Sequence, residues 1–407
     1  MHRVVVIGSG GREHALADVM SRDADVIVTP GNAIIPNSAE TSPVEIEADL
    51  FVIGPEAPLV NGLADQLREQ GKLVFGPGAD GAQVEGSKAW MKDLVMEANV
   101  PTAQYGTFTE IDQAQTCLET MSAPYVIKTD GLAAGKGVLV TDSLPEAKKT
   151  VENYLSGSAF GGAGEKIVLE EGLQGPEISI LAICDGKKAV ALSPAQDFTR
   201  LLDHDLGPNT GGMGAYSPVP IASQTLISDV LNNFIQPTID TLIQRGIDYR
   251  GVLYAGLMLT SDGPKLLEYN VRFGDPEAQV VLPRLETSLT ELLLEAANGN
   301  IQTEPVFTSD AMVTVVCATA GYPTSPHVGD PITGIEQATQ SPGIEKVYAA
   351  GINLNEAQQP ITGGGRVLAV TGRGPTIKVA RENAYTGADK IHWEGLQKRQ
   401  DIAERIE

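Results

Sequence analysis

Short apolar runs alternate with helix-like segments over the first 85 residues of the chain. Three such runs are bounded by turn-forming or polar residues: Val4–Ile7, Val26–Val28 and Leu50–Ile53. Uninterrupted apolar runs of this length are typical of strands buried on both faces of a sheet. Leu59, Leu63 and Leu67 recur every four residues and predict a helix packed on that sheet. The alternation predicts a doubly wound parallel sheet over residues 1–85.

The pattern changes after a predicted helix over residues 86–98, which stops before Pro101. Beyond it we predict four short strands, over residues 125–128, 138–140, 167–170 and 177–183. Ser143 and Glu146 have the spacing of a capping box at the start of a helix. Asp185 and Gly186 are typical of a hairpin turn. These elements predict a small α+β module over about residues 120–190.

The rest of the chain has the pattern of a mixed α/β protein. We predict helices near residues 223–245, 288–298 and 376–390, and strands over 252–259 and 265–271. Further short strands are predicted in the last hundred residues. We therefore divide the chain into an N-terminal domain (1–91), a central domain (92–300) that contains the small module, and a C-terminal mixed β/α domain (301–407).

Composition and charge narrow the classes of function. The chain has 407 residues and a formal net charge of −23, which argues against a nucleic acid or an anionic membrane surface as partner. The three cysteines are far apart and odd in number, so neither a disulfide framework nor a zinc site is favoured. The chain contains no apolar run of membrane-spanning length. We expect a cytoplasmic protein.

A first glycine cluster follows the first predicted strand and opens a helix. Gly8, Gly10 and Gly11 would let backbone N–H groups approach a phosphate. A dinucleotide fingerprint needs a third glycine where Glu13 stands, so that interpretation is weakened. Another phosphate ligand and a purely structural turn both remain open.

A second glycine cluster extends from Lys128 to Val138 and contains Gly131, Gly135 and Gly137. It differs from a Walker A loop, because three residues separate its first two glycines and a strand follows. A glycine-rich loop between two strands, with a lysine at each end, can fold over a triphosphate as a flap. The alternative is a flexible hairpin that carries surface lysines.

A third cluster lies on the predicted strand over residues 265–271. Alternate residues of a strand share a face, so Glu268, Asn270 and Arg272 are predicted on one face, and Leu267 and Tyr269 in the core with Val271 and Phe273. A carboxylate beside an amide oxygen suits Mg²⁺, and an adjacent arginine suits a phosphoryl group or a carboxylate. The alternative is a half-exposed strand with an ordinary ion pair.

A fourth cluster combines Gln196–Arg200 with a loop over Gly207–Pro218 that holds four glycines in eight residues. So many glycines predict a backbone that closely approaches another group. A structural omega loop is the alternative.

These clusters, in this order, resemble those of the ATP-grasp enzymes, and most closely those of the phosphoribosylamine–glycine ligases. The resemblance runs almost from end to end and includes the following further motifs: Gly8–His14, Gly54–Pro58, Gly86–Lys88 and Gly363–Val367. It implies an ATP-grasp core of two α+β modules in the central domain. It also implies a reaction in which ATP, glycine and 5-phosphoribosylamine give glycinamide ribonucleotide, ADP and phosphate through a glycyl phosphate, in purine biosynthesis.

The resemblance assigns the following residues to ATP: Lys88, Lys128, Gly131, Gly135, Lys136, Gly137, Glu170, Leu173 and Glu177. The lysines and glycines would hold phosphates, the backbone of Glu170–Leu173 would meet adenine, and Glu177 would bind the ribose. The resemblance assigns Mg²⁺ or Mn²⁺ to Glu268 and Asn270. It makes Arg272 and Lys136 the catalytic residues.

The resemblance also implies a second set of residues, around glycine and phosphoribosylamine. These are Gly10, Gly11, Glu56, Asp197, Asn209, Thr210, Gly211, Gly212, Met213, Gly214, Arg272 and Asp275. The expected partners are thus small molecules, with neither nucleic acid nor membrane. We expect a monomer, with a weak dimer as the alternative.

Four features depart from the usual motifs or from related enzymes. Thr199 stands where a lysine is usual, and Val271, expected in the core, where a smaller residue or cysteine is common. The strand over Tyr254–Leu259 offers no acidic metal ligand, in contrast to many ATP-grasp enzymes but as in this family. The stretch from Gly31 to Leu50 is short, so a helix of the N-terminal domain is expected to be missing.

Three alternatives to the ligase remain at this point. They are another ATP-grasp carboxylate–amine ligase or carboxylase with a different acceptor, a nucleotide-binding protein without turnover, and an oxidoreductase. The Gly207–Pro218 loop disfavours the first, the intact Lys136, Glu268, Asn270 and Arg272 disfavour the second, and the failed fingerprint disfavours the third. We interpret His14 as a packing or capping residue of the first helix, not as a catalytic base.

Overall fold

The computed structural model describes residues 1–132, 137–157 and 165–406. Its N-terminal sheet is parallel, with strand order β2-β1-β3-β4. The strands are β1 (His2–Gly8), β2 (Ala24–Pro30), β3 (Leu50–Ile53) and β4 (Val74–Phe75). The helices are α1 (Gly11–Met20), α2 (Glu56–Val60) and α3 (Leu63–Glu69). The predicted doubly wound parallel domain is thereby confirmed.

Two local features of this domain bear on the predictions. The connection from β2 to β3 contains only a short 3₁₀ helix, η1 (Pro43–Glu45), as expected from its length. The prediction of one helix through Leu59, Leu63 and Leu67 was wrong. The helix is broken into α2 and α3 because Gly62 adopts a left-handed conformation (φ 80°), which glycine tolerates better than other residues.

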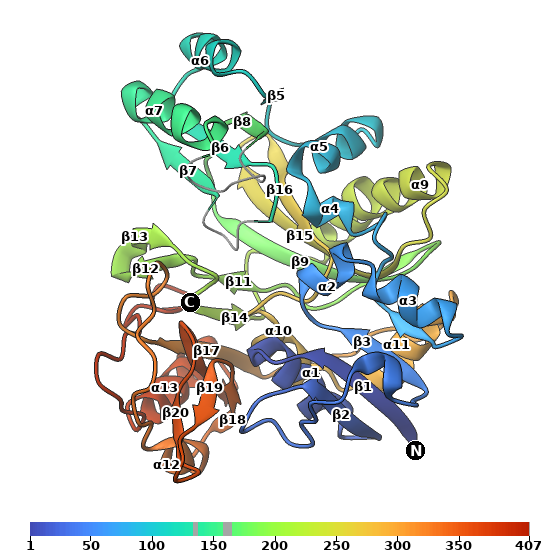
Figure 1. Ribbon diagram of the computed structural model, residues 1–407, viewed down its shortest axis with the longest axis vertical. Helices are drawn as coiled ribbons and strands as arrows, with labels where there is room; N and C mark the ends of the chain where they lie inside the picture. The colour runs from blue at the N-terminus through green and yellow to red at the C-terminus, as the bar shows by residue number, and fades with distance from the viewer. Residues whose placement is uncertain (133–136, 158–164, 407) are drawn as a thin grey trace.

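The small module forms the top of the molecule in Figure 1. Its antiparallel sheet has the order β5-β8-β6-β7. The strands are β5 (Tyr105–Phe108), β6 (Tyr125–Thr129), β7 (Val138–Thr141) and β8 (Ile167–Glu171), with helices α6 (Ile111–Thr120) and α7 (Leu144–Leu155). Leu118, Ile127 and Leu169 belong to its own hydrophobic core. We call residues 105–171 the lid module.

These bounds correct the predicted 120–190, because β5 joins the lid sheet while the strand from Glu177 pairs elsewhere. The predicted capping box forms only in part. Ser143 caps α7 by accepting a hydrogen bond from the Glu146 backbone, but the Glu146 carboxylate accepts one from Thr141 instead.

Below the lid module lies the central sheet, with order β10-β9-β15-β16. Its strands are β9 (Glu177–Asp185), β10 (Ala189–Ala191), β15 (Arg250–Thr260) and β16 (Gly263–Asn270). The helices of this region are α4 (Gln83–Gly86), α5 (Lys88–Glu97), α8 (Gln224–Val230), the π-helical η4 (Leu231–Ile235), α9 (Gln236–Gln244), α10 (Ala278–Val281), the 3₁₀ helix η5 (Leu282–Arg284) and α11 (Leu289–Ala297). The predicted helix over 223–245 is thus continuous but contains a π-helical turn.

The C-terminal sheet has the order β11-β14-β17-β21-β18 and is covered by α13 (Ile377–Ala388), with α12 (Ile335–Thr339) nearby. Its strands are β11 (Gln196–Asp197), β14 (Gly214–Ser217), β17 (Ala311–Ala318), β18 (Ile344–Ala349) and β21 (Arg366–Gly374). Two hairpins flank it: β12 (Arg200–Leu202) with β13 (Leu206–Asn209), joined by η3 (Asp203–Asp205), and β19 (Ile352–Leu354) with β20 (Pro360–Thr362). Because β14 pairs with β17, the glycine-rich loop of the central region enters this sheet.

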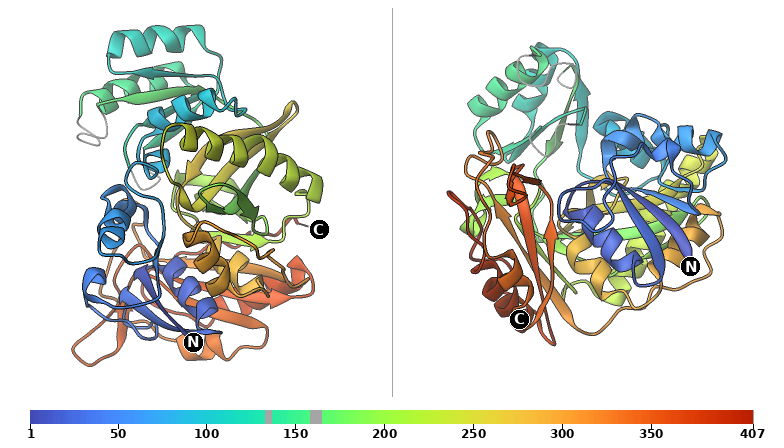
Figure 2. Two further views of the ribbon diagram at one scale, coloured as in Figure 1. Left: turned by 90° about the vertical axis from the view of Figure 1, so that its right-hand side faces the viewer. Right: turned by 60° about the horizontal axis from the view of Figure 1, so that its bottom comes forward.

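The N-terminal and C-terminal domains lie side by side beneath the central sheet, as Figure 2 shows in its right-hand view. They are joined by an ion pair between Asp18 of α1 and Lys346 of β18, whose closest atoms are 2.6 Å apart. His14 accepts a hydrogen bond from the backbone of Ala349 and packs edge-on against Tyr348. Burial and the nearby Lys346 lower the pKa of His14 to about 4. The packing interpretation of His14 is therefore confirmed.

None of the described helices is long and apolar enough to span a membrane.

Candidate active site

A buried cluster of three charges links the lid module to the central domain. Lys128 lies on β6, Glu170 on the neighbouring strand β8, and Lys92 on α5. The Glu170 carboxylate is 2.9 Å from Lys128 Nζ and 3.2 Å from Lys92 Nζ. All three side chains are buried. Buried charges require partners, so each lysine here depends on Glu170.

Hydrogen bonds to uncharged groups fix the positions of both lysines. Lys92 donates to Thr102 Oγ1 at 2.8 Å, and Lys128 donates to the backbone carbonyl of Leu267 at 3.2 Å. Burial, partly offset by Glu170, lowers the pKa of Lys92 to about 8. Burial alone would raise the pKa of Glu170, but the two lysines bring it below its usual value. The cluster therefore carries one net positive charge.

Helix α5 begins beside the glycine-rich segment. Ser87 caps the helix by accepting a hydrogen bond from Trp90, and its hydroxyl donates to Asp130 Oδ1. The same carboxylate oxygen accepts from the Ala89 backbone at 2.7 Å. Lys88, the first residue of α5, is thus held next to the segment that follows β6. The predicted Gly135 and Lys136 lie outside the described residues.

Glu268, Asn270 and Arg272 share one side, as predicted. Asn270 Nδ2 donates to Glu268 Oε1 at 3.4 Å, and Arg272 Nη2 donates to Asn270 Oδ1 at 3.3 Å. Tyr269 and Val271 are buried in the core, as expected. Leu267 was placed wrongly. A bulge opposite Gly256 and Leu257 interrupts the alternation, so Leu266 takes the core position.

Glu268 and Asn270 fit a hard divalent cation, because they offer one carboxylate oxygen and one amide oxygen side by side as metal ligands. Among the described residues, no group of three or more His, Cys, Asp or Glu side chains is arranged to hold a metal. A cation at Glu268 and Asn270 would therefore need further oxygen ligands from phosphates or water.

Arg272 joins this strand to the N-terminal domain. It lies 3.0 Å from Glu85 Oε1 and 3.4 Å from Glu56 Oε2. Burial alone would lower the pKa of Arg272, but these two carboxylates raise it above its usual value. Its Nε is buried without a hydrogen bond. Glu85 also accepts a hydrogen bond from the Val271 backbone at 2.8 Å. One carboxylate therefore holds both the arginine side chain and the backbone of the residue before it.

The glycine turn after β1 is filled by the side chain of Glu13. Its carboxylate accepts a hydrogen bond from Gly10 N at 2.6 Å, and a Cβ at Gly54 would lie 2.1 Å from Glu13 Oε1. Arg12 donates to the same carboxylate at 2.7 Å and to the Phe273 carbonyl at 3.1 Å. The structure therefore gives these glycines a packing role. A role toward a phosphate stays a prediction.

The glycine-rich loop between β13 and β14 turns around Thr210. Thr210 donates to the Thr199 carbonyl through its backbone (2.8 Å) and through its hydroxyl (2.7 Å), and its hydroxyl accepts from Gly212 N. Met213 does not fit the predicted substrate contact. Its side chain is fully buried and its backbone N–H and C=O are both hydrogen-bonded within the protein. Met213 is therefore a packing residue.

A second carboxylate cluster lies between β11 and β15. Tyr254 donates to Glu277 Oε1 at 2.7 Å, and its hydroxyl is 2.6 Å from Ser179 Oγ. Burial, followed by repulsion from Glu277 and Glu177, raises the pKa of Asp197 well above its usual value. Tyr254 thus lies on the strand on which many ATP-grasp enzymes carry an acidic metal ligand.

Several residues around the site were not predicted: Lys92, Glu85, Glu277 and Arg12. Lys92 could have been found, because it follows Lys88 by four residues on a predicted helix and so shares its face. Glu277 lies two residues after Asp275, which was assigned to the substrates, but was itself given no role. No sequence signal marks Glu85, which meets Arg272 only through the tertiary fold.

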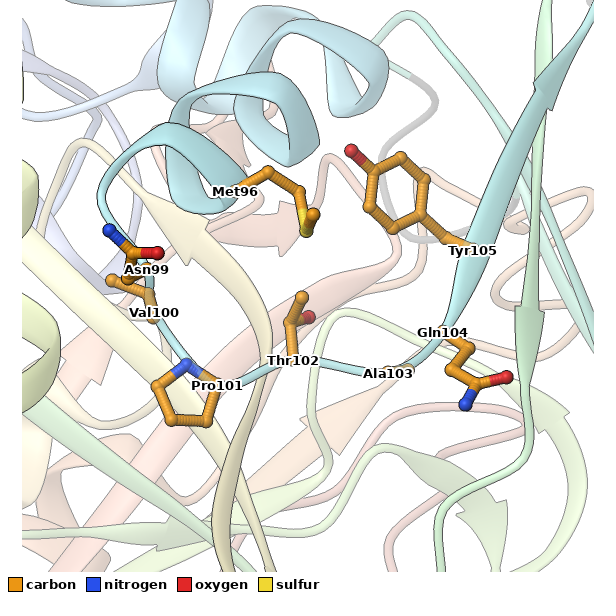
Figure 3. A pocket seen from close by; sticks show the side chains of 8 residues that line it. All are labelled: Met96, Asn99, Val100, Pro101, Thr102, Ala103, Gln104 and Tyr105. Atoms are coloured by element: carbon orange, nitrogen blue, oxygen red, sulfur yellow. The ribbon is translucent and has the colours of Figure 1, made fainter.

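A separate pocket of about 490 Å³ opens where α5 leads into β5. Figure 3 shows Met96, Thr102 and Tyr105 around the same space. The Tyr105 ring centroid is 5.5 Å from Lys92 Nζ. The eight residues that line this pocket include none of the predicted site residues. The pocket is therefore a different surface from the candidate active site.

Comparisons with known proteins agree with this arrangement. Three regions match the domains of phosphoribosylglycinamide synthetase: residues 2–85 the N domain, 86–278 the ATP-grasp (A) domain and 312–405 the C domain. The chain belongs to this family. The phosphoribosylglycinamide synthetase family also contributes a solved relative, the phosphoribosylamine–glycine ligase of Thermotoga maritima. It is 35% identical, with a TM-score of 0.86 over 98% of this chain and 100% of that one.

Curated members of the family are similar over nearly their whole length. The phosphoribosylamine–glycine ligase of Streptomyces coelicolor is 46% identical over 98% of both chains, and that of a Nostoc species is 44% identical over 99% of both. The biotin carboxylase domain of Hydrogenobacter thermophilus 2-oxoglutarate carboxylase, solved with MgADP, shares the fold at 14% identity. Its TM-score is 0.71 over 98% of this chain and 92% of that chain.

Proposed function

We propose that this protein is an ATP-dependent ligase that joins glycine to 5-phosphoribosylamine, giving glycinamide ribonucleotide, ADP and phosphate in purine biosynthesis. The observation that carries the proposal is the meeting of the central and N-terminal domains at Arg272. This arginine lies beside Glu268 and Asn270 of the central domain and pairs with Glu56 of the N-terminal domain. Membership of the family over nearly the whole chain supports it.

On the nucleotide side, we assign ATP phosphates to Lys88, Lys128, Lys136 and the backbone of Gly131–Gly137. The lysine–glutamate cluster supports this, because its net positive charge suits a polyphosphate. The backbone of Glu170–Leu173 would meet adenine, and the exposed carboxylate of Glu177 at the start of β9 would take the ribose hydroxyls. The side chain of Glu170 is used instead to orient Lys128.

We assign Mg²⁺ or Mn²⁺ to Glu268 and Asn270. The bound cation would neutralise charge on the ATP phosphates during transfer. Arg272 is placed to stabilise negative charge on a transferred phosphoryl group, and its position beside Glu268 and Asn270 supports that role.

The proposed chemistry has two steps. A carboxylate oxygen of glycine attacks the γ-phosphorus of ATP, and the bond to the bridging oxygen breaks to release ADP. The amine of phosphoribosylamine then attacks the carbonyl carbon of the glycyl phosphate, phosphate leaves, and the new amide nitrogen loses a proton. The protein contributes mainly by positioning reactants and neutralising charge. The two substrates would be surrounded by the following groups: Gly10, Gly11, Glu56, Asp197, the backbone of Asn209–Gly212 and Gly214, and Asp275.

The test is ADP formation with a panel of amino acids, with phosphoribosylamine generated in the assay. With phosphoribosylamine present, we expect glycine to be the one amino acid of the panel that supports ADP release at full rate. Glycinamide ribonucleotide should form at the same time. A preference for another carboxylic acid, or glycine-dependent ADP release with a different amine acceptor, would contradict the proposed function.

A further inference from the structure

The Gly363–Val367 motif has no part in the site described so far, yet its arginine reaches that site. Arg366 begins β21 in the C-terminal sheet. Its Nη1 donates to the Gly211 carbonyl at 2.6 Å and to the Asp275 carbonyl at 2.7 Å, and lies 3.5 Å from Asp275 Oδ1. One guanidinium therefore ties the glycine-rich loop to the segment that follows β16.

A second side chain of the C-terminal domain holds the same glycine. The Tyr322 hydroxyl accepts a hydrogen bond from Gly211 N at 2.9 Å. Both backbone groups of Gly211 are thus bonded to side chains from residues beyond 311. The motif also explains how Tyr322 is seated, because a Cβ at Gly365 would lie 2.3 Å from its ring. Gly365 leaves room for the tyrosine, and Arg366 follows directly.

Arg366 also acts on the charge of Asp275. Burial would raise the pKa of Asp275, but Arg366 and Arg12 outweigh burial and bring it below its usual value. Gln279 donates to Asp275 Oδ1 at 2.8 Å. Asp275 is therefore held as a carboxylate by groups from the N-terminal, central and C-terminal domains. It stands directly before a cis peptide bond to Pro276.

We propose that Arg366 and Tyr322 are positioning residues, through which the C-terminal domain fixes the Asn209–Gly212 backbone and Asp275 for binding of glycine and phosphoribosylamine. This inference rests on the proposed function. It gives the C-terminal domain a direct part in the substrate half of the site and none in the nucleotide half. The contacts of Arg366 and Tyr322 are with the backbone of Gly211 and Asp275, so the proposed effect of both residues is on the geometry of the site.

The test compares Arg366→Ala, Arg366→Lys and Tyr322→Phe with Arg373→Ala. Arg373 lies on the same strand and pairs with Asp310 and Glu345, away from the site. KM for ATP, glycine and phosphoribosylamine and kcat are measured for each. Because Arg366→Ala removes two charge-assisted hydrogen bonds that tie the Gly211 loop to Asp275, we expect it to raise KM for glycine or phosphoribosylamine about tenfold or more. KM for ATP should stay within about twofold.

Arg366→Lys should recover part of the loss, since lysine keeps the charge but not the planar fork. Tyr322→Phe should raise the same KM by a few fold, and Arg373→Ala should change none of them. An equal rise in all three KM values for Arg366→Ala, or no rise at all, would overturn the inference.

Hydrogen exchange of the intact protein supplies a readout that does not need turnover. Exchange at the Gly211 and Gly212 amides should become faster in Tyr322→Phe and Arg366→Ala, and stay unchanged in Arg373→Ala. Unchanged exchange in the first two variants would overturn the inference even if the ligase activity is confirmed. Faster exchange in a protein whose wild type lacks glycine-dependent activity would contradict the proposed function but not the tether.

Discussion

The nucleotide half and the substrate half of the candidate site are built in different ways. Around Lys128, charge is set by side chains that pair with one another: Lys92 and Lys128 share Glu170 within a buried cluster. Around Gly211, side chains hold backbone groups, as Arg366 and Tyr322 do. We propose that the first half provides charge for phosphates and that the second provides shape for small polar substrates. The two halves meet at Arg272.

The largest expected effect concerns the metal ligands. Glu268→Ala removes the only carboxylate proposed to hold the cation, so phosphoryl transfer should lose charge neutralisation. We expect Mg²⁺-dependent ADP formation to fall by roughly a thousandfold, with an unchanged melting temperature. Asp262→Ala, on the turn at the other end of the same hairpin, is the matched control. Near-normal activity of Glu268→Ala over a Mg²⁺ and Mn²⁺ titration would refute the metal assignment.

The next prediction addresses the buried cluster. In Lys92→Met, Glu170 keeps only Lys128, and that lysine should be drawn toward the carboxylate. We expect a loss of about 3 kcal/mol in the free energy of unfolding and a rise of about tenfold in KM for ATP, with KM for glycine unchanged. Lys148→Met, which removes an exposed ion pair of the lid module, is the control. A stability loss without any change in KM for ATP would show that the cluster is structural only.

A smaller effect is expected in the N-terminal wall of the substrate half. Gly54→Ala would place a Cβ 2.1 Å from Glu13 Oε1, so Glu13 and its partner Arg12 must shift. We expect KM for glycine or phosphoribosylamine to rise several fold while KM for ATP stays constant, because a hydrogen-bonded carboxylate is displaced. Gly71→Ala, at a left-handed glycine (φ 78°) with open space around it, is a control for loss of stability without displacement of Glu13. If only KM for ATP rises in Gly54→Ala, the division into halves is wrong.

The smallest expected effect is on pH-dependent stability. Asp197 has a raised pKa, so the folded protein binds a proton that the unfolded chain releases above pH 3.8. Stability therefore falls as pH rises through the folded-state pKa. Asp197→Asn cannot ionise, and its melting temperature relative to wild type should be about 2–4 °C higher at pH 8 than at pH 5. Asp229→Asn on α8 should show no such trend. A difference independent of pH would contradict the raised pKa.

The contrast between the two halves also explains which features of the fold and the site could be predicted from the sequence. The parallel N-terminal sheet could be predicted from apolar runs. Chemistry and strand periodicity also single out Lys128, Glu268, Asn270 and Arg272 as candidates. Glu85 and Arg366 were not assigned roles, because their partners are distant in the chain and are joined only by the fold. Met213 was misplaced because a glycine-rich motif does not say which of its members faces the core. The break at Gly62 depends on one left-handed residue, and the bulge near Leu267 on a shift in pairing that alternation alone does not show.

The most direct measurement compares Lys92→Met with Arg366→Ala in one experiment, in which KM for ATP and for glycine is determined for both. We expect a crossed result. Lys92→Met should raise KM for ATP and leave KM for glycine unchanged, and Arg366→Ala should do the reverse. A rise of both KM values by the same factor in both variants would contradict the independence of the two halves of the site.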